Sequence, residues 1–112
     1  GQKKEAIERF NVSKFIKPDI ELLDKWANIP PHIEDLSQYL EDFKRWIDEK
    51  GQPGDYALIQ GDFGATVSIV DYCISKDITP IYATTERNVV EEKTGETIKI
   101  SREFKHVMFR KY

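Results

Sequence analysis

Four segments carry hydrophobic residues at the spacing of one helix face, so the pattern predicts four helices. They cover residues 1–11, 19–29, 34–51 and 64–77. The third is the clearest, because its apolar residues form one stripe, Leu36, Leu40, Phe43 and Ile47. Asn11 and Gly51 are suitable stops for the first and third helices.

The same spacing indicates which residues face the core. In the second helix we expect the buried face to hold Ile20, Leu23 and Trp26. In the fourth we expect it to hold Ile69, Val70, Cys73 and Ile74. These assignments rest on periodicity alone, and Trp26, Trp46 and Cys73 are better explained as core residues than as functional groups.

Shorter apolar runs bounded by turn residues predict the strands. We expect a short strand over 12–16, a buried strand over 55–60 and another over 79–85. A strand, a turn and a strand then follow, which predicts a hairpin over 88–101. The tail, 104–112, is also expected to be extended.

The order of these elements places the chain in the α/β class. Strand, helix and strand follow one another from 55 to 85, which predicts parallel strands joined by a right-handed crossover. We therefore expect one domain over 1–112, a mainly parallel sheet flanked by helices, with a β-rich C-terminal end. A strand ahead of the first helix would complete the alternation, so we expect that the first strand is missing.

Composition narrows the class of protein. Of the 112 residues 39% are hydrophobic, enough for one core. Charged residues make up 33% but leave a net charge of −3, which argues against a protein that binds long nucleic acid through excess Lys and Arg. One cysteine and two histidines favour neither a disulfide nor a metal site, and we expect no cofactor. With no apolar run near the ~20 residues of a membrane span, we expect a cytoplasmic protein.

One loop has the composition of a binding site. QGDFGAT, residues 60–66, lies between a predicted strand and the fourth helix. In an open parallel sheet, ligands bind beyond the carboxyl ends of the strands. The N–H groups at a helix N-terminus favour an anion such as phosphate, and Gly61 and Gly64 allow close approach of the backbone. Side chains for a ribose or phosphate come from Gln60, Asp62 and Thr66.

The next predicted strand ends at the same edge of the sheet. ATTER, residues 83–87, would bring the hydroxyls of Thr84 and Thr85 and the guanidinium of Arg87 to this pocket. A structural explanation of the loop is about as good, since Asp62 or Thr66 can simply cap the helix. A Walker A loop is absent, because no Gly-Lys-Ser/Thr follows the glycines.

The tail holds weaker candidates. His106 and Arg110 fall on one face of an extended strand, roughly 13 Å apart at ~3.3 Å per residue. His106 is a candidate acid or base, because the histidine side chain as a class changes its charge near neutral pH, although a packed or exposed histidine is the commoner case. Arg110 is a candidate clamp for a phosphate.

Four stretches of this sequence are WANIPP (26–31), DYALIQGDFGAT (55–66), PIYATTER (80–87) and FKHVMFRKY (104–112). Together they resemble the small stand-alone CRISPR-associated proteins of the CARF type, the CRISPR-associated Rossmann fold. The most specific part is QGDFGAT with YATT-R, and the resemblance runs over most of the chain. It implies a Rossmann-like fold and a homodimer.

The resemblance also implies a ligand, cyclic oligoadenylate, the second messenger of type III CRISPR defence. Ring nucleases of the group cleave cyclic tetra-adenylate without a metal and switch the response off. A ribose 2′-hydroxyl attacks the adjacent phosphate and leaves linear di-adenylate with a 2′,3′-cyclic phosphate. Carried over by position, the pocket residues are Gln60, Gly61, Asp62, Phe63, Gly64, Ala65, Thr66, Thr84, Thr85 and Arg87. The catalytic candidates beside the scissile phosphate are Arg87, His106 and Arg110.

Two alternatives stay open beside the ring nuclease. A pocket without a group that activates the 2′-hydroxyl would make a sensor or a sponge for the messenger. An α/β interaction module would bind no nucleotide at all. Members of the group begin with a strand that helps to build the ligand site, and its absence here leaves the catalytic assignment incomplete.

Overall fold

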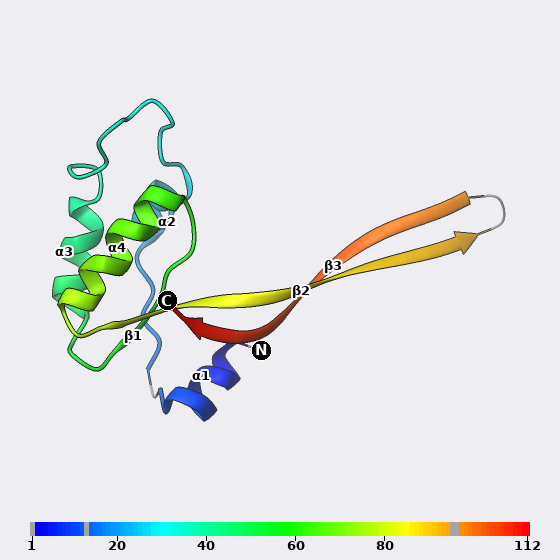
Figure 1. The fold of residues 1–112 in the computed structure, drawn as a ribbon, viewed down its shortest axis with the longest axis horizontal. Helices are drawn as coiled ribbons and strands as arrows, with labels where there is room; N and C mark the ends of the chain where they lie inside the picture. The colour runs from blue at the N-terminus through cyan, green and yellow to red at the C-terminus, as the bar shows by residue number, and fades with distance from the viewer. Residues whose placement is uncertain (1, 13, 95–96) are drawn as a thin grey trace. The chain divides into compact units, whose positions relative to one another are not determined.

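The computed structural model describes residues 2–12, 14–94 and 97–112, with the backbone alone for 87–104. Its strands form a three-stranded sheet in the order β1-β2-β3. The predicted α/β class is confirmed (Figure 1). The elements in chain order are α1 (Gln2–Phe10), α2 (Ile20–Ala27), α3 (Glu41–Lys50), β1 (Tyr56–Leu58), α4 (Phe63–Ser75), β2 (Thr79–Thr94) and β3 (Thr97–Lys111).

The chain divides into two units, which are described separately below. The helical unit consists of Lys14–Tyr82 with Lys111–Tyr112, and the hairpin unit of Gly1–Ser13 with Ala83–Arg110. The strands β2 and β3 contribute residues to both units. The single domain expected over 1–112 stays a prediction.

The helical unit contains the predicted strand–helix–strand step. β1 pairs in parallel with the start of β2, with Tyr56 opposite Thr79 and Leu58 opposite Ile81. The helix α4 connects the two strands, so the parallel pairing expected for this segment is confirmed. Many α/β folds share this step, so it establishes the class and leaves a Rossmann fold open.

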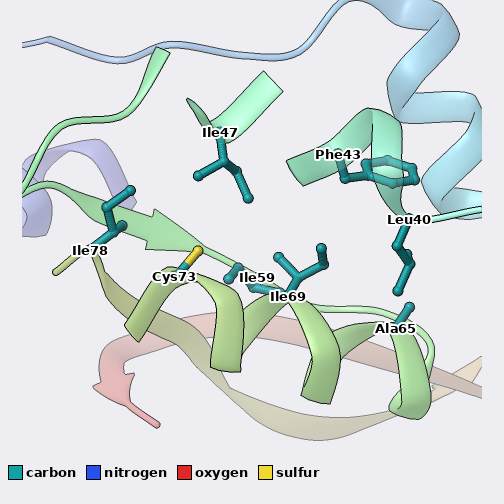
Figure 2. Packing of buried hydrophobic residues seen from close by; sticks show 8 residues of the cluster. All are labelled: Leu40, Phe43, Ile47, Ile59, Ala65, Ile69, Cys73 and Ile78. Atoms are coloured by element: carbon teal, nitrogen blue, oxygen red, sulfur yellow. The ribbon is translucent and has the colours of Figure 1, made fainter. Parts of the chain in front are cut away.

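The core of the helical unit lies between α3 and α4 and reaches Ile59 after β1 (Figure 2). From α3 and its N-cap come Leu40, Phe43 and Ile47, which confirms the predicted stripe, and Leu36 packs against it. From α4 come Ala65, Ile69 and Cys73 at four-residue spacing. Burial raises the pKa of the Cys73 thiol to about 11, as expected for a core cysteine.

Three expectations about the helices are wrong. α3 begins at Glu41, since turns precede it and the Asp35 carboxylate accepts hydrogen bonds from the Ser37 N–H and hydroxyl, 2.9 and 2.6 Å away. On α2 the predicted inner residues Ile20 and Leu23 are exposed, and Leu22 packs on the core with Trp26 instead. On α4 Ile74 is exposed. Periodicity locates an apolar stripe, but the neighbouring helix selects which part of it is covered.

The described residues of the segment 12–16, which are 12 and 14–16, are irregular and do not form the expected strand. Asn11 stops α1 as expected, because it takes a left-handed conformation with φ of 56°. The Val12 N–H then donates to the Ala6 carbonyl, 3.2 Å away. Phe15 and Ile16 are exposed.

The strand predicted over 79–85 does not end there. β2 continues to Thr94 and is followed by β3, so one long hairpin replaces the expected strand, hairpin and tail. No glycine or proline lies between Ile81 and Thr94 to interrupt the strand. Thr84, Thr85 and Arg87 consequently lie within a strand, which contradicts the strand end on which the second half of the predicted pocket rested.

Leu40→Ala is expected to lower the free energy of unfolding by about 2–5 kcal/mol, because it leaves a cavity where α3 meets α4. The matched control is Leu23→Ala, on an exposed side chain, with an expected change near 0.5 kcal/mol. Urea unfolding followed by circular dichroism measures both. Equal losses in the two variants would contradict this description of the core.

Candidate functional site

The loop from β1 to α4 is organised by Asp62. Its carboxylate accepts a hydrogen bond from the Ala65 N–H at 3.0 Å, and its carbonyl accepts one from the Thr66 N–H at 2.8 Å. Asp62 is therefore the N-cap of α4, as the structural explanation expected. Its carboxylate places negative charge at the helix N-terminus, which opposes a phosphate at this position.

The backbone of the same loop lies against Trp26. The indole Nε1–H donates to the Gln60 carbonyl at 2.7 Å, and the indole ring packs edge-on against Phe43. A Cβ on Gly61 would lie 2.7 Å from Trp26 Nε1, and the φ of Gly61, +155°, is rare for other residues. The glycine predicted to approach a ligand thus approaches a tryptophan of its own chain. Trp26 is a structural residue here, as expected.

The remaining loop residues differ in what they present to solvent. Phe63 is 91% exposed, and Gln60 and Gly64 are also exposed. Ala65 is fully buried, so its side chain cannot line a pocket. The Thr66 hydroxyl is buried and has no hydrogen-bond partner within the described part of the chain.

The second half of the predicted site belongs to the hairpin unit. The Thr84 hydroxyl donates to the Met108 carbonyl at 3.0 Å and accepts from the Met108 N–H at 3.1 Å, so it is occupied by the backbone of β3. Thr85 is exposed, and the side chain of Arg87 lies outside the described residues. Residues 60–66 belong to the helical unit, so the structure describes the two halves only separately.

Glu5 is the central residue of the hairpin unit, and sequence reasoning missed it. Its carboxylate accepts the Phe109 N–H at 2.8 and 3.0 Å and contacts His106 Nε2 at 2.7 Å. Arg9, one turn later on α1, binds Glu5 at 3.0 Å and donates to the Phe109 carbonyl. The pair thus satisfies both backbone polar groups of Phe109. The only signal in the sequence is the i,i+4 spacing of Glu5 and Arg9.

His106 lies between Glu5 and the ring of Phe109, whose centroid is 4.9 Å away. When Glu5 is ionised, its carboxylate accepts a hydrogen bond from Nε2–H of His106. Nδ1 is then the ring nitrogen that remains for another partner. Nδ1 is buried and has no hydrogen-bond partner among the described residues. His106 lines a depression of about 560 Å³ with Glu5, Arg9, Lys4, Glu8 and Val107. Arg110 is exposed on the same strand and does not line it.

The surroundings of Glu5 shift its pKa. Burial raises it, but hydrogen bonds from the Phe109 N–H, from His106 and from Arg9 outweigh burial and hold the pKa below the usual value of 4.5. The carboxylate therefore stabilises the folded hairpin unit at neutral pH. Across the described ranges, no group of three or more His, Cys, Asp or Glu side chains could hold a metal ion. None of the described helices is long and apolar enough to cross a membrane.

Comparisons with known proteins give a family. The family model described as "Uncharacterized protein MJ1673 family" matches residues 1–110. The protein described as "Uncharacterized protein MJ1673", from Methanocaldococcus jannaschii, is 44% identical over 109 residues, which are 96% of this chain and 84% of that protein. No solved structure matches the chain.

Glu5→Gln is expected to expose the Phe109 amide to faster hydrogen exchange at neutral pH. In the unaltered protein the stabilisation by Glu5 is fully present above the pKa of an unfolded glutamate, 4.5, and is lost as pH falls through the lower pKa of the folded state. Exchange followed by NMR between pH 3 and 7 measures it, with Glu8→Gln on the same helix as control. A pH profile unaltered by Glu5→Gln would show that Glu5 does not hold β3.

Gly61→Ala is expected to destabilise the helical unit by about 1–3 kcal/mol, because it adds backbone strain and displaces the Trp26 indole. Gly54→Ala is the matched control, since its φ is +94° but no atom lies within 4 Å of the added Cβ. Thermal unfolding gives the stability, and tryptophan fluorescence reports the indole. If both variants shift the fluorescence equally, the contact with Trp26 is not the reason for this glycine.

Proposed function

We propose that this chain, which belongs to the MJ1673 family, binds cyclic oligoadenylate as a homodimer and cleaves cyclic tetra-adenylate. The cleavage would switch off type III CRISPR signalling in the cytoplasm. The observation that carries the proposal is the loop from β1 to α4. It follows a strand paired in parallel with β2 and precedes a helix N-terminus, where α/β folds bind nucleotides. We propose that this step belongs to a Rossmann-like sheet of the CARF type.

Asp62 indicates which part of the nucleotide this loop suits. One acceptor position of its carboxylate binds the Ala65 N–H, and a carboxylate has about four such positions. The others suit the hydroxyls of a ribose, whereas a phosphate would meet like charge. The proposal therefore assigns the ribose to Asp62 and Gln60. Arg87 and Arg110, which belong to the hairpin unit, stay the predicted partners of the phosphate.

The proposed cleavage needs no co-reactant. The ribose 2′-oxygen forms a bond to the adjacent phosphorus, the bond from phosphorus to the 5′-oxygen breaks, and a proton passes from the 2′-hydroxyl to the leaving 5′-oxygen. This step opens the ring, and the same step at the opposite phosphate gives two molecules of linear di-adenylate. Arg87 would stabilise the charge that develops on the phosphoryl oxygens. His106 is the proposed carrier of the proton, because Glu5 binds and orients Nε2, and Nδ1 has no hydrogen-bond partner among the described residues.

A binding-only sponge is the second candidate, and one observation favours it. His106 Nδ1 is buried, so it meets a 2′-hydroxyl only if the residues that cover it move. A protein that retains the pocket but cannot reach the hydroxyl would bind the messenger without turnover. Binding and cleavage therefore have to be measured separately.

Labelled cyclic tetra-adenylate is mixed with the protein in EDTA, and the products are separated by chromatography. The expected product is linear di-adenylate with a 2′,3′-cyclic phosphate. Arg87→Ala should slow the reaction about 100-fold or more, because it removes charge stabilisation from the transition state. Arg45→Ala, on an exposed side chain of α3, is the control and should leave the rate unchanged.

A binding assay on the same samples separates the candidates. Tight binding without product would favour the sponge. Neither binding nor cleavage, with cyclic tetra-adenylate or with cyclic hexa-adenylate, would overturn the adenylate proposal and leave the interaction module.

A further inference from the structure

One face of α4 carries an apolar stripe, and most of this stripe is exposed. Phe63, Val67, Val70 and Ile74 follow one another at i, i+4, i+7 and i+11, which places them in a single stripe. Phe63 is 91%, Val67 68% and Ile74 55% exposed, and Val70 is half-buried. Single exposed hydrophobic residues are common, but a continuous stripe marks an interaction surface.

A groove runs beside this α4 stripe. Its volume is about 240 Å³, and its walls are almost entirely apolar. The residues that line it all belong to the helical unit, and they are Thr66, Val67, Val70, Asp71, Ile74 and Tyr112. The stripe and the groove together offer a ridge and a recess, the two features that pack one helix against another.

We propose that a second copy of this chain docks on the α4 stripe, with the two α4 helices antiparallel. The first argument is the order of the side chains. A two-fold axis between residues 68 and 69 places Phe63 opposite Ile74 of the second copy and Val67 opposite Val70. Every member of the stripe then meets an apolar partner, as a self-complementary interface requires.

Charge supports the antiparallel arrangement. Asp62 lies at the N-terminal end of the stripe and Lys76 at the C-terminal end. The antiparallel pairing brings Asp62 of one copy beside Lys76 of the other, and it sets the opposite ends of the two helix dipoles together. Lys76 contacts Asp48 at 3.7 Å, an exposed ion pair that contributes little and leaves the ammonium able to reorient.

The size of the surface predicts a concentration-dependent dimer. α4 has 13 residues and is about 20 Å long, so one stripe supplies less than the roughly 800 Å² per partner of a standard interface. The homodimer itself is part of the proposed function, on which this inference rests, and the inference adds the surface through which the two copies bind. Binding through this surface requires no nucleotide. The inference assigns the side chain of Phe63 to the contact between copies, whereas the resemblance places it in the ligand pocket.

Sedimentation velocity over a concentration series, without nucleotide, is the first test. Val67→Glu and Ile74→Glu should each weaken dimer formation about tenfold or more, since each places two carboxylates in the apolar interface. Ile20→Glu is the control: this side chain is 82% exposed on α2, outside the stripe, and should leave dimer formation unchanged. Circular dichroism checks that all variants are folded.

Cysteine cross-linking tests the direction of the helices. Phe63→Cys and Ile74→Cys, mixed under mild oxidation, should form a disulfide between the two variants. Neither should cross-link alone, because the two copies of one position lie about 16 Å apart in the antiparallel register, too far for a disulfide. Cys73 is fully buried and does not compete.

Three results would overturn the inference. The protein can stay monomeric throughout the concentration series, it can form a dimer that the two glutamate variants leave unaltered, or each cysteine variant can cross-link with itself. A protein that stays monomeric would also remove the homodimer from the proposed function, whereas the other two results would overturn this interface alone. The chromatography and binding assays measure binding and cleavage of cyclic oligoadenylate separately.

Discussion

The packing of α3 against α4 is the constraint on which the helical unit depends. Leu40 and Cys73 are completely or almost completely excluded from solvent, and Phe43, Ile47 and Ile69 close the cluster around them (Figure 2). Because α4 connects β1 to β2, fixing α4 also fixes the start of the sheet. The loop that precedes α4 is then held at two points, by its own cap at Asp62 and by the indole of Trp26.

The hairpin unit depends on a polar contact instead. Glu5 and Arg9 on α1 bind the N–H and the carbonyl of Phe109, the two groups that a further strand would otherwise bind. The helix thereby covers part of the edge of β3 by side chains alone. This use of Glu5 also determines the position of the His106 ring, so the structural contact and the proposed proton carrier share one carboxylate.

Three parts of α4 have different roles. Its buried face contributes to the core, its N-terminus carries the loop proposed to bind a ribose, and its outer stripe is proposed to meet a second copy. Phe63 is the first residue of α4, so it lies where the proposed ribose-binding loop meets the outer stripe. A dimer formed through α4 would therefore place the two loops at opposite ends of the helix pair, about 16–20 Å apart along its axis.

The sequence by itself determined the features that local pattern controls: the helices α1, α2 and α4, the stripe of α3, the parallel pairing of β1 with β2, and the presence of a hairpin but not its length. These follow from the spacing of apolar residues within about 20 positions, and from the stops at Asn11 and Gly51. The tertiary structure decided what depends on distant partners. Trp26 meets Gln60 across 34 positions, and Glu5 meets Phe109 across 104, with no pattern that links them. The neighbouring helix likewise decides which apolar residues of a helix are buried: on α2 it covers Leu22 and not Ile20. Periodicity shows that a helix has an apolar side, but only the packing partner determines which residues of that side are covered.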